Sequence, residues 1–179
     1  MSQSQVRPRS YTLCLLLSLL LAACSNDSSK GSAGASGTAY HIDCNSTTAS
    51  EGTIDAPWSD LQSAGSITLE PGDRLLLRRG TTCNGMLKPQ GSGAPDNRIL
   101  IGAYGEGLLP RIDAQGMHSA AVHLDDMSHV VVRDLELTNP GNLSEPHRGV
   151  YLTTTETVVT NVEIRDLYIH DVTGLVTFS

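Results

Sequence analysis

Short apolar runs, separated by Gly, Pro, Asn or Asp, recur along most of the chain. They lie at Arg74–Arg78, Ile99–Ile101, Ala120–Leu124, Val130–Val132, Leu135–Leu137, Val150–Leu152, Val162–Ile164 and Leu167–Ile169. A strand places successive side chains on opposite faces, so Val122 and Leu124 are expected to point inward while His123 points outward. Many short strands without a helical pattern between them predict an all-β architecture.

An internal repeat indicates which all-β architecture is present. Residues 130–139 (VVVRDLELTN) align with residues 162–171 (VEIRDLYIHD) at an offset of 32, and residues 121–124 (AVHL) align with residues 149–152 (GVYL) at an offset of 28. A period near thirty with three short strands per copy predicts a solenoid, with a bend at Arg-Asp in each copy. Equivalent aliphatic side chains would then stack in ladders, namely Val132, Leu135 and Leu137 under Ile164, Leu167 and Ile169.

The segment before the repeat predicts a strand, a helix and a turn. Tyr40–Ile42 is typical of a short strand, and Glu70–Asp73 is typical of a turn. Residues Asp55–Ala64 contain a proline near their start and place Trp58 and Leu61 three positions apart. This spacing predicts a short amphipathic helix that shields the first coil of the solenoid.

The first residues are typical of an export signal. Arg7 and Arg9 precede an apolar run, Leu13–Ala23, that is too short to span a bilayer. The ending Leu-Ala-Ala-Cys24 resembles the lipobox of bacterial lipoproteins, which implies removal of residues 1–23 and lipidation of Cys24. The alternatives are an ordinary signal peptide cut elsewhere and a short membrane anchor.

Residues 24–38 are rich in Ser, Gly and Ala, a composition typical of a flexible tether. In the sorting pattern that the lipobox resembles, a residue other than Asp after the lipidated Cys favours the outer membrane, and Ser25 stands there. We therefore expect a lipid-anchored protein of the bacterial cell envelope, at the outer membrane or cell surface.

Composition narrows the possible partners and the redox state. The 179 residues carry a net charge of -7 and few aromatic side chains, so nucleic acid is excluded as a partner and the core must be aliphatic. Cys14 leaves with the leader and Cys24 takes the lipid, which leaves Cys44 and Cys83. Two cysteines in an exported domain predict one disulfide, the alternative being two separate thiols.

Three segments carry a resemblance to a known family. Pro71-Gly72-Asp73-Arg74 with its following strand, Ile101-Gly102-Ala103-Tyr104-Gly105 and residues 162–171 resemble the N-terminal half of right-handed parallel β-helix proteins of the pectate-lyase-like superfamily. The resemblance implies a right-handed parallel β-helix of about three coils over residues 39–179. Gly174–Ser179 begins a further apolar strand, so we expect the solenoid to be incomplete, the alternative being a short β-helix that dimerises through its open end.

The resemblance implies action on a polysaccharide, often one that contains uronate. Our leading hypothesis is cleavage by β-elimination, which needs a base and a cation that neutralises the uronate carboxylate. Two alternatives stay open. One is hydrolysis, which needs two carboxyl groups beside the glycosidic bond, and the other is a non-catalytic surface module that binds glycan or has a structural role.

Several outward-facing residues are candidates for this chemistry. His147 and Arg148, at the end of a loop, would serve as base and carboxylate clamp, unless the loop is simply solvated. His170 and Asp171 are a second catalytic candidate, or else a ladder that stabilises a turn.

Acidic and basic residues add a possible cofactor and a possible binding surface. Asp125 and Asp126 are the candidates for binding Ca²⁺, whereas Asp134 and Asp166, each beside an arginine, are expected to cap turn amides. Residues 74–111 have a net charge of +4 within an otherwise acidic chain. This basic band would face an anionic glycan or protect strand edges from pairing.

Overall fold

The computed structural model describes residues 37–47, 50–142, 144–155 and 158–174. The predicted leader at 1–23, lipidation at Cys24, nearly all of the tether at 24–38 and the strand expected after Gly174 lie outside the described residues, and they stay predictions. Within the described ranges, no helix has the length and apolar character needed to cross a membrane.

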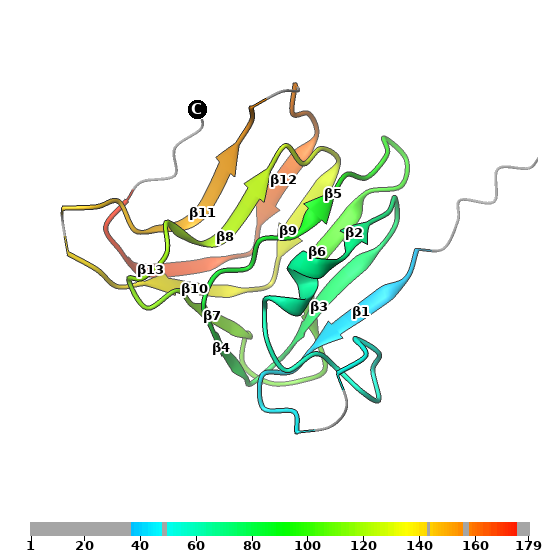
Figure 1. The fold of residues 1–179 in the computed structure, drawn as a ribbon, viewed down its shortest axis with the longest axis horizontal. Coiled ribbons are helices and arrows are strands. Elements are labelled where there is room, and N and C mark those ends of the chain that lie inside the picture. Colours follow the sequence, from blue (N-terminus) through cyan, green and yellow to red (C-terminus); the bar gives the residue numbers. More distant parts are fainter. Residues whose placement is uncertain (1–36, 48–49, 143, 156–157, 175–179) are drawn as a thin grey trace, which may run out of the picture. The chain divides into compact units, whose positions relative to one another are not determined.

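The described chain consists of short strands and one turn of 3-10 helix (Figure 1). The strands are β1 (Ala39–Ile42), β2 (Thr68–Leu69), β3 (Arg74–Arg78), β4 (Thr82–Asn84), β5 (Gln90–Gly91), β6 (Ile99–Tyr104), β7 (Arg111–Asp113), β8 (Ala120–Asp125), β9 (Val130–Arg133), β10 (Glu136–Asn139), β11 (Arg148–Thr153), β12 (Val162–Arg165) and β13 (Tyr168–Val172). The helix η1 is Ser63–Ser66.

Parallel pairing between successive coils builds the sheets. One sheet has the order β1-β3-β6-β9-β12, a second β13-β10-β7-β4, a third β11-β8 and a fourth β2-β5. All of these strand pairs are parallel, and Figure 1 shows the strands of each sheet following one another in chain order. The chain is therefore a parallel β-solenoid of about three turns, as the repeat predicts.

The observed registers match the predicted repeat. Val130 pairs with Val162 in β9–β12, Leu137 pairs with Ile169 in β10–β13, and Leu124 pairs with Leu152 in β8–β11. Because the offset of 32 matches two of these strand pairs and the offset of 28 matches the third, the aliphatic ladders form in the predicted order. The fully buried members include Leu75, Leu77, Ile99, Ile101, Ile112, Leu124, Val130, Val132, Leu135 and Leu137.

The bends at the repeated Arg-Asp pairs have left-handed backbone. Asp134 has φ 58° and Asp166 has φ 52°, a conformation that Asp tolerates better than most residues. The Asp134 amide donates to the Asp166 carbonyl oxygen at 3.1 Å, and Arg133 lies 3.2 Å from the Asp134 carboxylate. These contacts agree with a structural role for both aspartates.

The helix predicted at Asp55–Ala64 is wrong. Trp58 instead forms a parallel bridge with Ile42: its amide donates to the His41 carbonyl oxygen at 2.9 Å, and its carbonyl oxygen accepts from Asp43 N at 2.8 Å. An extended residue that pairs with β1 cannot also belong to a helix. The segment still covers the first coil, because Trp58, Leu61 and Ala64 are buried in the core.

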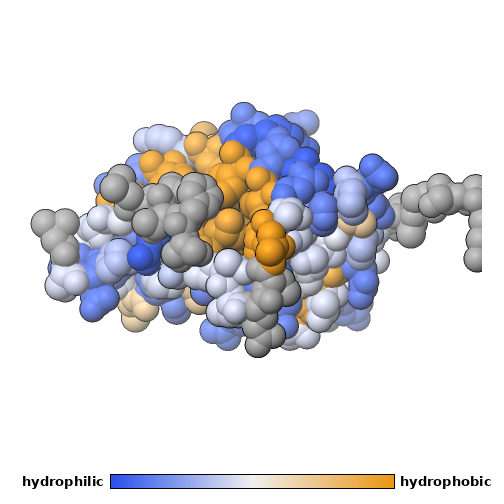
Figure 2. All heavy atoms as spheres, turned by 90° about the horizontal axis from the view of Figure 1, so that it is seen from above, coloured by the Kyte–Doolittle hydropathy of each residue, from blue (hydrophilic) through white to orange (hydrophobic). Residues whose placement is uncertain are grey.

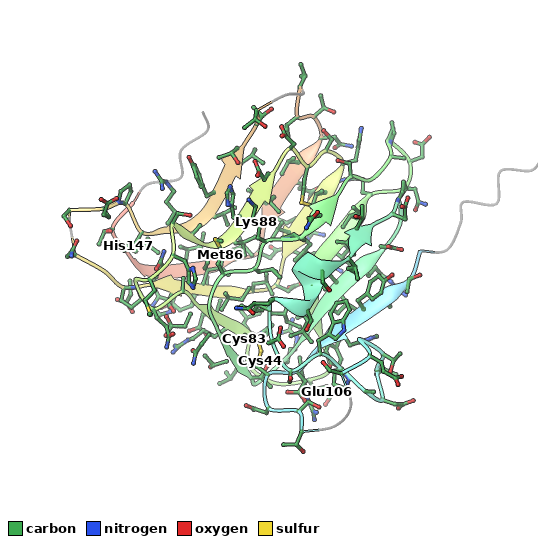
Figure 3. The ribbon with its side chains drawn as sticks, in the orientation of Figure 1. Cys44, Cys83, Met86, Lys88, Glu106 and His147 are labelled. Atoms are coloured by element: carbon green, nitrogen blue, oxygen red, sulfur yellow. A yellow bond between two sulfur atoms is a disulfide. The ribbon has the colours of Figure 1, made fainter. Side chains whose placement is uncertain are left out.

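A disulfide joins Cys44 to Cys83, with the Cα atoms 5.3 Å apart. Cys44 follows β1 and Cys83 lies in β4, where its side chain is fully buried (Figure 3). The bond therefore ties the turn after β1 to the sheet that begins with β4.

The last coil buries its aliphatic side chains less completely than the coil before it. Val162, Ile164, Leu167 and Ile169 are partly buried, whereas their counterparts one coil earlier are fully buried. The four side chains of the last coil are covered less completely, so each contributes less to stability. Figure 2 shows one area of the surface where apolar residues gather between polar ones.

Candidate functional site

The outer face of the sheet formed by β8 and β11 carries a cluster of charged, polar and aromatic side chains. Leu87 bridges to Val122, which adds the segment around Leu87 to this sheet and brings Lys88 next to His123. The β8–β11 register then places His123 beside Tyr151. Three successive coils thus contribute one side chain each to a row across the coils, Lys88–His123–Tyr151.

Three hollows of about 630, 400 and 330 Å³ adjoin along this face. The first and second share Gly65 and Lys88 in their linings, and the second and third share His118. His123 and Tyr151 line none of the hollows, but they lie on β8 and β11 together with Asp125 and Arg148, which do. We call the three hollows and the row Lys88–His123–Tyr151 together the groove. Figure 3 shows Lys88 and Met86 over the β8 region and His147 farther along, by the loop before β11.

Aromatic and cationic groups form the surface of the row Lys88–His123–Tyr151. The rings of His123 and Tyr151 are stacked with centroids 5.0 Å apart, and the guanidinium of Arg148 lies 4.3 Å from the centroid of the Tyr151 ring. The faces of the Tyr151 ring are therefore covered by His123 and Arg148, and the group offers ring edges and a positive charge to a ligand.

A chain of polar contacts joins Lys88 to His123 through Asp125 and Thr153. Lys88 Nζ lies 3.0 Å from Asp125 Oδ2, the Thr153 hydroxyl donates to Asp125 Oδ1 at 2.6 Å, and His123 Nε2 lies 2.9 Å from Thr153 Oγ1. The residues come from β8, β11 and the segment before β5, so their relative positions are fixed by strand pairing.

The surroundings lower the pKa of both Asp125 and His123. Hydrogen bonds from Thr153 and Lys88 lower the pKa of the Asp125 carboxyl, so it is ionised near neutral pH. Burial lowers the pKa of His123, and the charge of Lys88 lowers it further, so its imidazole is neutral there. The site therefore combines a carboxylate with a neutral imidazole.

Four of the sequence candidates lie in the groove. His147 and Arg148 line the hollow of about 330 Å³, and Asp125 and Asp126 line that of about 630 Å³ at the other end. The two pairs occupy different hollows rather than a single centre. His147 is buried, and its ring packs so closely against Gly141 that a β-carbon added there would overlap the ring.

The calcium candidates already have partners. Asp125 is paired with Lys88 and Thr153, and Asp126 accepts from Thr155 N at 2.9 Å and Thr155 Oγ1 at 2.7 Å. In the ranges that the structure describes, no group of three or more His, Cys, Asp or Glu side chains is arranged to hold a metal ion. Ca²⁺ binding at Asp125 would require displacement of the Lys88 ammonium group.

His170 and Asp171 lie on β13, in the sheet of β4, β7 and β10, and they are not among the residues that line the groove. His170 Nδ1 lies 2.9 Å from Asp171 Oδ2, and its Nε2 lies 3.1 Å from Glu136 Oε1, while Glu136 also pairs with Arg111. These contacts join β13 to β10 and β7 across neighbouring coils.

The His170 cluster predicts a pH-dependent contribution to stability. Hydrogen bonds to Glu136 and Asp171 raise the pKa of His170 above its usual 6.5. The stabilisation is therefore complete below pH 6.5 and is lost as the pH rises through the higher pKa of the folded state. We expect the wild-type protein to lose about 0.2–1 kcal/mol relative to His170→Gln between pH 6 and pH 9 in urea unfolding. Equal pH profiles for the two proteins would contradict the prediction.

Sequence reasoning missed the partnership of Lys88, Asp125, Thr153 and His123. The available signal was the alignment of residues 121–124 with 149–152, which places His123 and Tyr151 at one repeat position. Lys88 lies in no recognisable copy of the repeat, so the sequence does not reveal that it lies beside His123.

Comparison with known proteins identifies similar crystal structures but no matching family model. No family model matches the chain, and no curated protein matches it. Two crystal structures of GH136 lacto-N-biosidase from Eubacterium ramulus, the selenomethionine derivative and the native protein, are similar with TM-scores of 0.69 and 0.68. Both are 28% identical to this chain and cover 76% of it, while the chain spans 27% and 28% of their lengths.

These neighbours allow a comparison of the leading hypothesis, β-elimination, with its alternative, hydrolysis. They are glycosidases with a β-helix related to this one, and they fit the hydrolase alternative better than the expected β-elimination. A carbohydrate partner fits both readings.

Proposed function

We propose that this protein is a glycan-active β-helix protein that takes part in hydrolysis of glycosidic bonds, and that the groove is its glycan-binding surface. The observation that carries the proposal is the likeness of 76% of the chain to the lacto-N-biosidase structures. The long polar groove supports it, because an oligosaccharide needs an elongated surface with many hydrogen-bonding groups.

The groove residues suit a sugar ligand. The stacked rings of His123 and Tyr151 offer apolar edges to a sugar ring, while Lys88, Asp125 and Arg148 offer charged hydrogen-bonding groups to its hydroxyls. Hydrolysis requires two carboxyl groups. The carboxylates that line the groove are Asp125 and Asp126 in one hollow and Glu145 in another, and replacement of each by its amide tests which of them takes part in hydrolysis.

Attachment to the cell envelope is part of the same proposal. A lipid on Cys24 and the tether at 24–38 would hold the β-helix at a membrane surface, where it meets extracellular glycans. The mass of the mature N-terminal residue tests this point.

The activity is tested by incubating the protein with a panel of neutral and uronate-containing oligosaccharides, including lacto-N-biose. Hydrolysis releases new reducing ends without an unsaturated product, whereas elimination gives an unsaturated product that absorbs ultraviolet light. Binding without cleavage would support the groove and leave the reaction to other parts of a larger protein. Neither binding nor cleavage of any panel member would overturn the proposal.

A pair of tyrosine variants tests the location of the glycan. Tyr151→Ala is expected to weaken glycan binding about 5- to 30-fold, because loss of a central aromatic contact costs about 1–2 kcal/mol. Tyr168→Ala is the matched control, since Tyr168 is 57% exposed and lies in β13, outside the groove. Calorimetric titration with a panel member that binds measures both. Equal affinities for the two variants would place the glycan elsewhere.

A further inference from the structure

The hydroxyl of Thr153 stands between a carboxylate and an imidazole. It lies 2.6 Å from Asp125 Oδ1 and 2.9 Å from His123 Nε2. A hydroxyl has one hydrogen to donate and can accept from other donors. The direction of its single donation therefore determines which nitrogen of His123 carries a proton.

That direction follows from the charge of Asp125. An ionised carboxylate accepts hydrogen bonds and cannot donate them, and Lys88 Nζ at 3.0 Å holds Asp125 in this form. Thr153 must donate to Asp125. Its oxygen is then the acceptor toward His123, so the Nε2 atom of His123 must carry the hydrogen.

The second nitrogen of the ring is left without a proton. A neutral imidazole carries one hydrogen, so when Nε2 is protonated Nδ1 is a hydrogen-bond acceptor. Among the residues that the structure describes, none forms a hydrogen bond with His123 Nδ1. Stacking on Tyr151 fixes the plane of the ring on the outer face of the sheet.

We propose that His123 Nδ1 accepts a hydrogen bond from a hydroxyl group of the glycan, and that Asp125 and Thr153 are positioning residues that hold the imidazole in the required tautomer. This inference rests on the proposed function of the groove. It assigns the groove a specificity: a sugar with a hydroxyl at this point is bound, and its deoxy or O-methylated analogue is rejected because the acceptor is left unpaired.

The surroundings of His123 keep it neutral. The charged and titratable groups that face it are Lys88 before β5, Asp125 on its own strand, and Arg148 and Tyr151 on β11. Lys88 and Arg148 oppose a charge on the imidazole, and Asp125 favours one. Protonation at low pH would turn Nδ1 into a donor, so glycan binding should decline as the pH falls through the pKa of His123.

The tautomer is tested without any ligand. Long-range ¹H–¹⁵N NMR spectra of the full chain, assigned with His123→Phe, are expected to show a hydrogen on Nε2 of His123. In Asp125→Asn the carboxamide can donate to Thr153, which frees the Thr153 hydroxyl to donate to Nε2, and the hydrogen is expected to move to Nδ1. A wild-type protein with its hydrogen on Nδ1 would overturn the inference, whatever the glycan result.

Binding variants test the role of the acceptor. His123→Phe keeps a ring to stack on Tyr151 but lacks the nitrogen, and both it and Asp125→Asn are expected to bind the glycan at least tenfold more weakly. Asp166→Asn, at a bend outside the groove, is expected to bind as the wild type does. Thermal unfolding of each variant separates weak binding from misfolding.

The possible failures are distinguishable. If the wild-type protein binds no panel member, the proposed function fails, although the tautomer spectrum can still be read. If it binds and His123→Phe binds equally well, the groove function stands and the acceptor role of His123 is overturned.

Discussion

Joint replacement of Cys44 and Cys83 by serine is expected to lower the free energy of unfolding by about 4 kcal/mol. The two residues are 39 positions apart in sequence. Closing a loop of that length removes conformational entropy from the unfolded chain and raises its free energy by about this much. The loss is large compared with the total stability of a small domain, about 5–15 kcal/mol. We expect the double variant to unfold at a clearly lower denaturant concentration.

Urea unfolding of both proteins, with and without a reducing agent, measures this effect. Reduction should bring the wild-type protein close to the double variant and leave the double variant unchanged. A free-thiol assay on the native wild-type protein should detect no reaction at Cys44 or Cys83. Equal stabilities in the absence of reductant would show that the bond does not restrain the chain.

Leu137→Ala is expected to destabilise the protein by about 2–5 kcal/mol. Leu137 is fully buried in β10 and pairs with Ile112 in β7 on one side and with Ile169 in β13 on the other. Coils on both sides prevent collapse around the shortened side chain, so the variant loses transfer free energy and gains a cavity.

Ile169→Ala provides the matched comparison, because Ile169 occupies the same repeat position in the last coil. It is only partly buried, so its truncation should cost clearly less than that of Leu137. Urea unfolding of the two variants gives both values. Equal costs would mean that Ile169 is as well covered in solution as Leu137.

The repeated coils were predictable because they use local rules. Alternation identified the inward side chains, the offset of 32 identified which strands pair, and Asp134 and Asp166 marked the bends. Each of these signals depends on a few adjacent residues and on their copy one coil away. Parallel stacking converts that sequence periodicity directly into contacts.

The capping segment and the groove were harder to predict because they depend on contacts that do not repeat. Trp58 has helical spacing to Leu61, yet pairing with Ile42 satisfies backbone groups at the edge of β1 and determines its conformation. Lys88 reaches the groove through an isolated bridge at Leu87. His147 was recognised as a candidate from its loop, but its burial against Gly141 is a tertiary property.

The row Lys88–His123–Tyr151 contains one residue from each of three coils. Strand pairing sets the distance between neighbouring coils at about 4.8 Å. Loops between the strands can differ in length without changing that distance, as the offsets of 28 and 32 within this chain demonstrate. If the groove binds glycan as proposed, a descendant of this protein could therefore acquire a new ligand preference by exchanging single outward residues or by lengthening a loop, while the spacing between the side chains of successive coils would be inherited unchanged.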